Sequence, residues 1–188
     1  MDHHPGLSPE EKSFLLQLAR EVISLRCRGE GSPQHPVHSK KLNRKFGVFV
    51  TLHKGNDLRG CIGYVEGIKP LQSAVIDMAN SAAFNDPRFK PVTEAELDHL
   101  TIEISVLSAL DKVEDINDII VGRDGLLIEK SVFSGLLLPQ VASELGWDRK
   151  TFLSQTCIKA GLPENEWKSG KCTIYKFSAE IFSETEIS

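Results

Sequence analysis

The sequence lacks any apolar run that approaches the length of about 18 residues needed by a membrane-spanning helix. Its start, MDHHPGLSPEEK, has neither the basic region nor the apolar stretch of a secretory signal peptide. With 40% hydrophobic and 26% charged residues, the chain has the composition of a soluble globular protein. We therefore expect a cytoplasmic protein that makes no contact with membranes.

Cysteine is scarce, and its four copies, at positions 27, 61, 157 and 172, stand far apart in the sequence. They form no C-x-x-C pair and no His/Cys cluster at metal-ligand spacing, which argues against a zinc site and a disulfide framework. The chain also lacks G-x-G-x-x-G, P-loop and H-E-x-x-H motifs. We predict free thiols, no bound metal and no cofactor.

The charge balance is slightly acidic, with a net charge of −4, and gives no general attraction to nucleic acid. One basic run, KKLNRK at 40 to 45, is a candidate RNA contact. Such a run is more often a solvated surface, so we expect no nucleic-acid partner.

Helix and strand patterns alternate along the chain. Ser8, Pro9 and Glu11 form an N-terminal capping signature, and Gly29 and Gly31 end the helix that it predicts. After an extended loop over 31 to 42, the patterns predict a hairpin in 46–65, a helix over 71–84, a strand over 100–107, short strands in 121–139 with turns at Asp124-Gly125 and Ser134-Gly135, helices beginning near 139 and 149, and a last strand near 173–177. The two halves share the order hairpin, helix, strand, and an internal structural duplication is one interpretation.

The first hairpin, FGVFVTLHKGNDLRGCIGYV, has apolar residues at even positions on both strands. If both even sets are buried on one face, a three-residue loop at 55 to 57 gives the required register. This register pairs His53 with Arg59 and Thr51 with Cys61, and it places these side chains together on the other face. A two-residue loop would separate the cysteine from the histidine.

Cys61 is the candidate nucleophile. Arg59 is the candidate group to lower the pKa of the thiol, and His53 is the candidate base to accept its proton. Gly60 and Gly63 are candidate ligand-binding positions, because a ligand can approach a glycine backbone closely. The alternative is equally concrete: cysteine is a common small core residue, and glycine beside it allows close helix packing.

The segment NDPRF supplies two further candidates for ligand binding, Asp86 and Arg88. The arginine could hold a substrate carboxylate or phosphate through its guanidinium fork. In the alternative, the two residues form an ion pair that ties the loop down.

LRGCIG, FNDPRF, EISVL and GLLLPQVASELGW occur in this order along the chain. On these segments the sequence resembles the AMMECR domain family, whose prokaryotic members are called AmmeMemoRadiSam system protein A. The resemblance implies one domain over 1–188, with a core from about 10 to 180. It also implies an α+β fold of two unequal, interlocked subdomains with antiparallel sheets flanked by helices.

The resemblance implies no particular reaction. The system name records genes that occur beside those of a Memo-like protein and a radical SAM enzyme, which are therefore the expected partners. Two hypotheses follow, and whether the chain is an enzyme stays open between them. The chain is either a thiol-dependent enzyme in their shared pathway, or a non-catalytic binding or adaptor module that presents a small-molecule or peptide ligand to them.

Overall fold

A computed structural model describes residues 5–187, which divide into two compact units. The larger unit comprises residues 5–107 together with the chain from Glu180 onward, and the smaller unit comprises Ser108–Ala179. The last strand, β7 (Thr173–Ser183), belongs to the smaller unit as far as Ala179 and to the larger unit from there on. The prediction of two unequal subdomains is confirmed.

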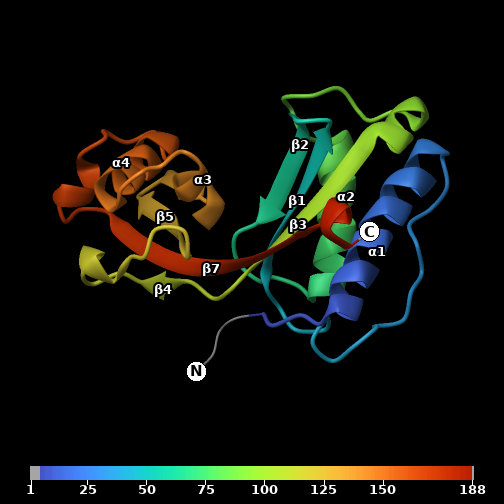
Figure 1. The fold of residues 1–188 in the computed structure, drawn as a ribbon, viewed down its shortest axis with the longest axis horizontal. Coiled ribbons are helices and arrows are strands. Elements are labelled where there is room, and N and C mark those ends of the chain that lie inside the picture. The colour runs from blue at the N-terminus through green and yellow to red at the C-terminus, as the bar shows by residue number, and fades with distance from the viewer. Residues whose placement is uncertain (1–4, 188) are drawn as a thin grey trace. The chain divides into compact units, whose positions relative to one another are not determined.

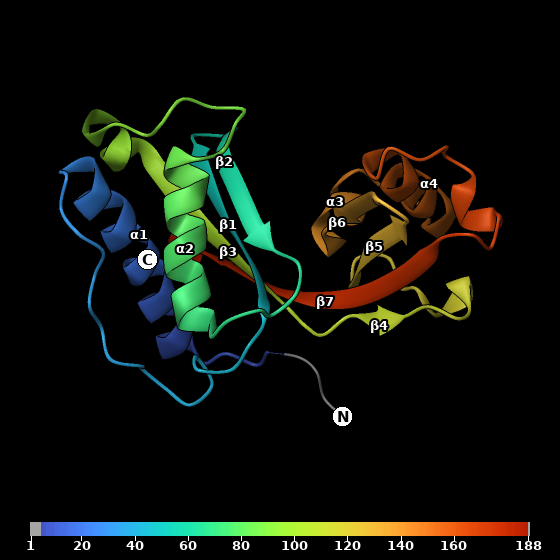
Figure 2. The same ribbon diagram turned by 180° about the vertical axis from the view of Figure 1, so that it is seen from behind.

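The larger unit is an antiparallel sheet with two helices on one face (Figures 1 and 2). Its elements are α1 (Pro9–Cys27), β1 (Gly47–Lys54), β2 (Asp57–Tyr64), α2 (Leu71–Phe84), η1 (Glu94–His99), β3 (Leu100–Leu107) and α5 (Glu184–Ile187). The strand order is β2-β1-β3-β7, where β7 contributes its end from Glu180 onward. Helix α2 lies against β1 and β2, and α1 lies against β3. Val48, Val50 and Leu52 are fully buried beneath these helices, as the alternation in the sequence predicts.

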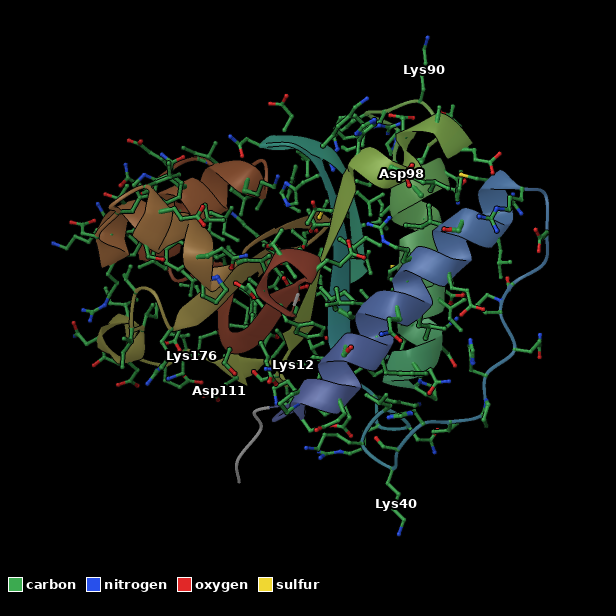
Figure 3. All side chains as sticks on the ribbon, turned by 45° about the vertical axis from the view of Figure 1, so that its right-hand side comes forward. Lys12, Lys40, Lys90, Asp98, Asp111 and Lys176 are labelled. Carbon is green, nitrogen blue, oxygen red and sulfur yellow. The ribbon has the colours of Figure 1, made fainter. Side chains whose placement is uncertain are left out.

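The predicted capping signature begins α1. The backbone N–H of Glu11 donates to the Ser8 hydroxyl at 3.2 Å, and the Glu11 carboxylate accepts from the Ser8 N–H at 2.9 Å. The basic run at 40 to 45 follows the extended loop. Lys40 points into solvent (Figure 3), whereas Leu42 in the same run is fully buried.

The smaller unit carries the remaining strands of the antiparallel sheet. Its elements are β4 (Asp111–Lys112), η2 (Ile116–Asp118), β5 (Asp124–Lys130), β6 (Phe133–Leu137), α3 (Pro139–Glu144), α4 (Arg149–Lys159), η3 (Glu166–Lys168) and most of β7. The strand order is β6-β5-β7, and β4 also pairs with β7. Between β4 and β7, the Lys176 Nζ lies 3.8 Å from the Asp111 Oδ2; Figure 3 labels both residues. Ile128, Phe152 and Cys157 are fully buried in the core of this unit.

Both predicted turns in the smaller unit are wrong. Asp124 and Gly125 begin β5, and Gly135 lies inside β6. The hairpin turns instead at Ser131 and Val132, where Ser131 has a φ of 55°. Gly135 allows the end of α4 to pack closely on β6, because an added Cβ would lie 2.3 Å from the Ala160 backbone nitrogen.

The two units repeat one topology. In each, the first strand of a hairpin also pairs with a later antiparallel strand: β1 pairs with β2 and β3, and β5 pairs with β6 and β7. In each, a glycine on the second hairpin strand meets the end of a helix. An added Cβ on Gly60 would lie 2.2 Å from the Ala82 carbonyl oxygen, just as Gly135 approaches Ala160. The strand pairing of the two units is therefore equivalent, which is what an internal duplication predicts.

None of the helices between residues 5 and 187 is long and apolar enough to cross a membrane.

Candidate functional site

The β1–β2 hairpin positions the candidate residues through a short loop and a bulge. Lys54 pairs with Asp57, so the loop has two residues rather than the predicted three. One extra residue on β2, Arg59, then restores the predicted register, and Thr51 pairs with Cys61. The loop and the bulge together give the same register at Cys61 that a three-residue loop would give.

The predicted pairing of His53 with Arg59 is wrong. His53 lies opposite Leu58 on β2 and Thr101 on β3, because Arg59 is the bulged residue. Leu58 consequently leaves the core face to which the sequence pattern assigned it, and 40% of its surface is exposed. Within residues 5–187, the His53 side chain makes no hydrogen bond or ion pair, and none joins it to Cys61.

The Cys61 thiol is half-buried, and its surroundings raise its pKa. The Thr51 hydroxyl donates a hydrogen bond to its sulfur at 3.3 Å. Burial raises the pKa of the Cys61 thiol above its ordinary value, and the carboxylates of Asp86 and Glu103 raise it further. The Thr51 hydrogen bond and the Arg88 charge lower this pKa, but burial prevails.

Arg59 does not act on the Cys61 thiol as predicted, because its guanidinium binds the carboxylate of Glu96. Its Nε and Nη2 donate to the two oxygens of Glu96 at 2.9 and 3.2 Å, and its side chain is only 13% exposed. This pairing lowers the pKa of Glu96 to about 2. The cation that acts on the Cys61 thiol is Arg88, from the loop after α2.

Asp86 and Arg88 close the outer edge of β2 at Cys61. The Asp86 carboxylate accepts from the Cys61 N–H at 2.9 Å, while Arg88 Nη2 donates to the Cys61 carbonyl at 3.3 Å. Arg88 also donates to Asp86 from its backbone N–H, its Nε and its Nη2 at 2.7 to 3.1 Å, which holds the pKa of Asp86 well below its usual range. The two side chains thus supply the acceptor and the donor that a neighbouring strand would supply.

The two glycines of LRGCIG are used for packing inside the larger unit. Gly60 faces α2, where the Ala82 carbonyl occupies the space of a side chain. Gly63 faces the other way, and an added Cβ would lie 2.3 Å from the ring of Phe49, its partner on β1. The space beside each glycine is therefore filled by the protein itself.

Two residues of this site, Glu96 and Phe89, are absent from the sequence-based candidates. Glu96 accepts from the Thr93 N–H and hydroxyl, both at 3.1 Å, in a capping box that begins η1. The pattern Thr-x-x-Glu was the available signal for this short helix. Phe89 has no comparable signal, yet the guanidinium groups of Arg59 and Arg88 lie 5.9 and 5.4 Å from its ring centroid.

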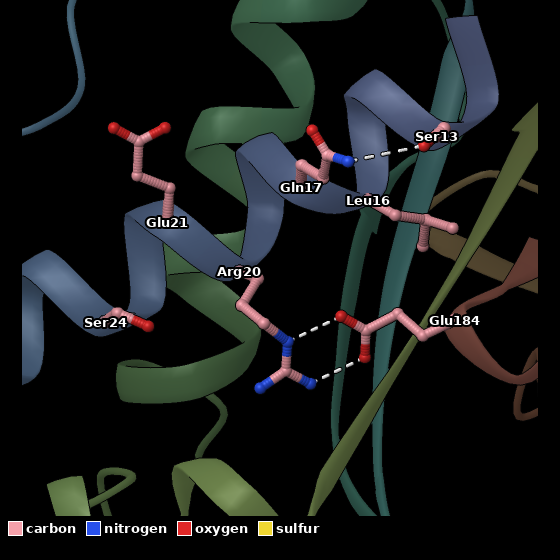
Figure 4. A pocket seen from close by; sticks show the side chains of 7 residues that line it. All are labelled: Ser13, Leu16, Gln17, Arg20, Glu21, Ser24 and Glu184. Carbon is pink, nitrogen blue, oxygen red and sulfur yellow. Dashed lines mark hydrogen bonds and ion pairs between the residues drawn. The ribbon is translucent and has the colours of Figure 1, made fainter. Parts of the chain in front are cut away.

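A concave surface lies along α1 and α5, away from the candidate residues in sequence, with a cavity volume of about 480 Å³ (Figure 4). Arg20 lines this surface and donates hydrogen bonds to both carboxylate oxygens of Glu184 at 2.5 and 2.6 Å. The same guanidinium donates to the carbonyls of Leu97 and Leu100 at 2.9 and 2.7 Å. Arg20 therefore holds α5 against α1 and the start of β3, which is a structural role.

Metal ligands are not clustered in the described part of the chain. Between residues 5 and 187, no group of three or more His, Cys, Asp or Glu side chains could hold a metal ion.

Comparison with known sequences decides the family. A family model described as AMMECR1 matches residues 16–182, a range that contains every candidate residue. The chain belongs to the AMMECR1 family. Protein TK0174 of Thermococcus kodakarensis is 47% identical to it over 189 aligned positions, which cover 95% of this chain and 92% of that protein. A protein of Methanothermobacter thermautotrophicus is 45% identical, with 95% and 96% covered.

A solved structure gives the same result for the fold. The crystal structure of uncharacterized protein PH0010 from Pyrococcus horikoshii matches with a TM-score of 0.89 at 44% sequence identity. The match covers 95% of this AMMECR1-family chain and 93% of that one. The α+β fold that the resemblance implied is confirmed.

Proposed function

We propose that this AMMECR1-family protein is a non-catalytic binding or adaptor module. Its ligand surface is the outer edge of β2 together with the loop of residues 85–89. Its partners are the Memo-like protein and the radical SAM enzyme that the system name of the family implies, and it presents a ligand to them in the cytoplasm.

The state of Cys61 is the observation that carries this proposal. A cysteine nucleophile needs a lowered thiol pKa or a base within hydrogen-bond reach. Burial raises the pKa of the Cys61 thiol, and the Arg59 guanidinium forms its ion pair with Glu96. Within residues 5–187, no hydrogen bond joins His53 to the thiol. The arrangement of Cys61, Arg59 and His53 therefore favours a role in packing and binding over nucleophilic catalysis.

Arg88 supplies the chemistry for binding. Its Nε and Nη2 are occupied by Asp86 and the Cys61 carbonyl, while Nη1 has no hydrogen-bond partner among residues 5–187. Half of the side chain is exposed, at 51%. The remaining donors of a guanidinium fixed in this way suit an acidic side chain or phosphate of a ligand.

Two observations favour the thiol-enzyme alternative, because a hydrogen bond from Thr51 lowers the pKa of the Cys61 thiol and so does the charge of Arg88. The Thr51 hydroxyl donates to the Cys61 sulfur, a contact that favours the thiolate. Both effects are opposed by burial and by the carboxylates of Asp86 and Glu103.

The rate of alkylation of each cysteine as a function of pH separates the two functions. Peptide mass spectrometry on the native protein reads Cys61 alongside Cys27 and Cys172, and the denatured protein gives the reference rates. We expect Cys61 to react slowly, with an apparent pKa above the free-thiol value of about 8.5. Rapid alkylation of Cys61 with an apparent pKa below that value contradicts the adaptor proposal and supports the enzyme.

Binding to the partners is tested directly. The purified protein is titrated by calorimetry with the Memo-like protein and with the radical SAM enzyme encoded in the same genome. Arg88→Ala removes the proposed contact, and Lys40→Ala, at an exposed lysine away from β2 in sequence and structure, is the matched control. We expect at least tenfold weaker binding for Arg88→Ala alone. Absence of binding to both partners by the wild-type protein contradicts their assignment.

A further inference from the structure

The smaller unit has an edge strand whose outward backbone groups are unpaired. In the β5–β6 hairpin, Lys130 and Phe133 flank a two-residue turn and form a hydrogen-bonded pair. Hydrogen-bonded and non-hydrogen-bonded pairs alternate from there along an antiparallel ladder. Ser134 and Leu136 therefore direct their N–H and C=O groups away from β5. Within residues 5–187, no hydrogen bond from another segment reaches these groups.

The larger unit shows how this fold closes the equivalent edge. Gly60 and Gly135 occupy the same position in the repeated topology, so Leu136 on β6 is the counterpart of Cys61 on β2. The outward N–H and C=O of Cys61 are closed by Asp86 and Arg88. The chain after α4 places no such side chain on the N–H or C=O of Leu136 in the described structure.

The open edge is also exposed, apolar and uncharged. Val132 is 88% exposed and Phe133 is 47% exposed. Residues 131–143 contain no charged side chain, and the strand itself contains no proline. Proteins usually protect an edge strand with charge, proline or a covering segment, and β6 has none of these on its outward groups.

We infer that the edge of β6 binds an extended, uncharged segment of a partner protein, which adds to the sheet as a further strand. Two outward residues offer four backbone hydrogen bonds, which fits a short peptide. A stable subunit interface needs about 800 Å² on each partner, more than one strand of five residues presents. The absence of charge on residues 131–143 favours an uncharged segment, because a charged one would lose hydration without gaining a counterion.

The inferred binding at the β6 edge does not depend on the β2 edge or on the proposed adaptor function.

Phe133 selects the side chains of the bound segment through the contact that its ring offers. Its ring lies 3.5 Å from the position of a Cβ added to Gly161, and 47% of the residue's surface is exposed. A segment paired with β6 would set alternate apolar side chains beside this ring.

Selection from a random heptapeptide library displayed on phage tests the inference on the full chain. Ser134→Pro removes an N–H that points away from β5 and leaves the hairpin bonds in place, while Ser134→Ala keeps that N–H. We expect enriched peptides to be uncharged with alternating apolar residues. They should bind Ser134→Ala like the wild type and Ser134→Pro at least tenfold more weakly.

Amide hydrogen exchange on the wild-type protein provides a measurement that needs no variant. Saturation with a selected peptide should slow exchange at Ser134 and Leu136 at least tenfold and leave Cys61 unchanged. The inference is overturned if no peptide is enriched, if the peptides bind Ser134→Pro as well as the wild type, or if exchange at Ser134 and Leu136 is unchanged. Sedimentation that shows a dimer sensitive to Ser134→Pro also overturns it, because the occupant is then a second copy.

Discussion

Removing the Asp86 carboxylate should destabilise the larger unit more than removing the Arg88 side chain that pairs with it. The Asp86 side chain is 1% exposed and accepts four hydrogen bonds, one from the Cys61 N–H and three from Arg88. Asp86→Ala leaves the Cys61 N–H without its acceptor and Arg88 without its counterion. Asp86→Asn keeps one acceptor for the Cys61 N–H but removes the charge.

The magnitude follows from the exposure of each partner. A buried N–H left without an acceptor costs about 1–3 kcal/mol. The Arg88 side chain is 51% exposed, so its ion pair is screened and adds at most about 1 kcal/mol. We therefore expect Asp86→Ala to lower the free energy of unfolding by about 1–4 kcal/mol, Asp86→Asn by about half as much, and Arg88→Ala by about 1 kcal/mol.

The pH dependence has a definite sign. Because Arg88 holds the pKa of Asp86 below its usual range, the ionised carboxylate stabilises the folded state fully above about pH 4, the unfolded value. That stabilisation is lost as the pH falls through the lower, folded-state pKa. The difference in unfolding free energy between wild type and Asp86→Asn should therefore be constant near neutral pH and shrink below about pH 4.

The assay needs two probes, because Trp147 and Trp167, the only tryptophans, both lie in the smaller unit. Urea unfolding followed by far-UV circular dichroism reports both units, and tryptophan fluorescence reports the smaller unit. The Asp86 variants should shift the dichroism transition. A loss below about 0.5 kcal/mol for Asp86→Ala, the scale of an ordinary surface substitution, would refute the argument that this carboxylate closes the strand edge.

Two further predictions concern the same unit. The Arg59 guanidinium lowers the pKa of Glu96 to about 2, so Glu96 stabilises the fold above about pH 4.3 and loses that contribution toward pH 2. Glu96→Gln should flatten the acid limb of the stability curve in urea titrations, and an unchanged limb contradicts the pairing. Gly60→Ala would place a Cβ 2.2 Å from the Ala82 carbonyl and should cost about 1–3 kcal/mol or more. Gly31→Ala, with nothing within 4 Å, should change thermal stability little, and equal effects of the two substitutions contradict the packing argument.

The fold could be predicted from the sequence because its signals are local. Ser8 and Glu11 lie three residues apart and satisfy each other at the start of α1. The strand over 100–107 follows directly from the alternation of Leu100, Ile102 and Ile104 with polar residues, and β3 has these bounds. Such patterns contain their own partners, so a single sequence displays them.

The candidate site could be predicted only in part, because its decisive contacts are remote in sequence. Arg59 leaves the ladder as a bulge and binds Glu96, 37 residues later. Asp86 reaches the Cys61 backbone across 25 residues. A local pattern can indicate that Thr51 faces Cys61, and the structure has this pairing, but it cannot indicate which charges lie beside the thiol.

The repeated topology separates what the fold requires from what is special to one unit. Gly60 and Gly135 both lie against the end of a helix, so glycine at this position is explained by packing in each unit. The residue that follows is Cys61 in one unit and Leu136 in the other, and among residues 5–187 the side-chain cap exists only beside the cysteine. A shared requirement of the fold cannot account for a feature that one repeat lacks. Cys61 and its cap are therefore the residues of LRGCIG and NDPRF whose presence a function of this protein must explain.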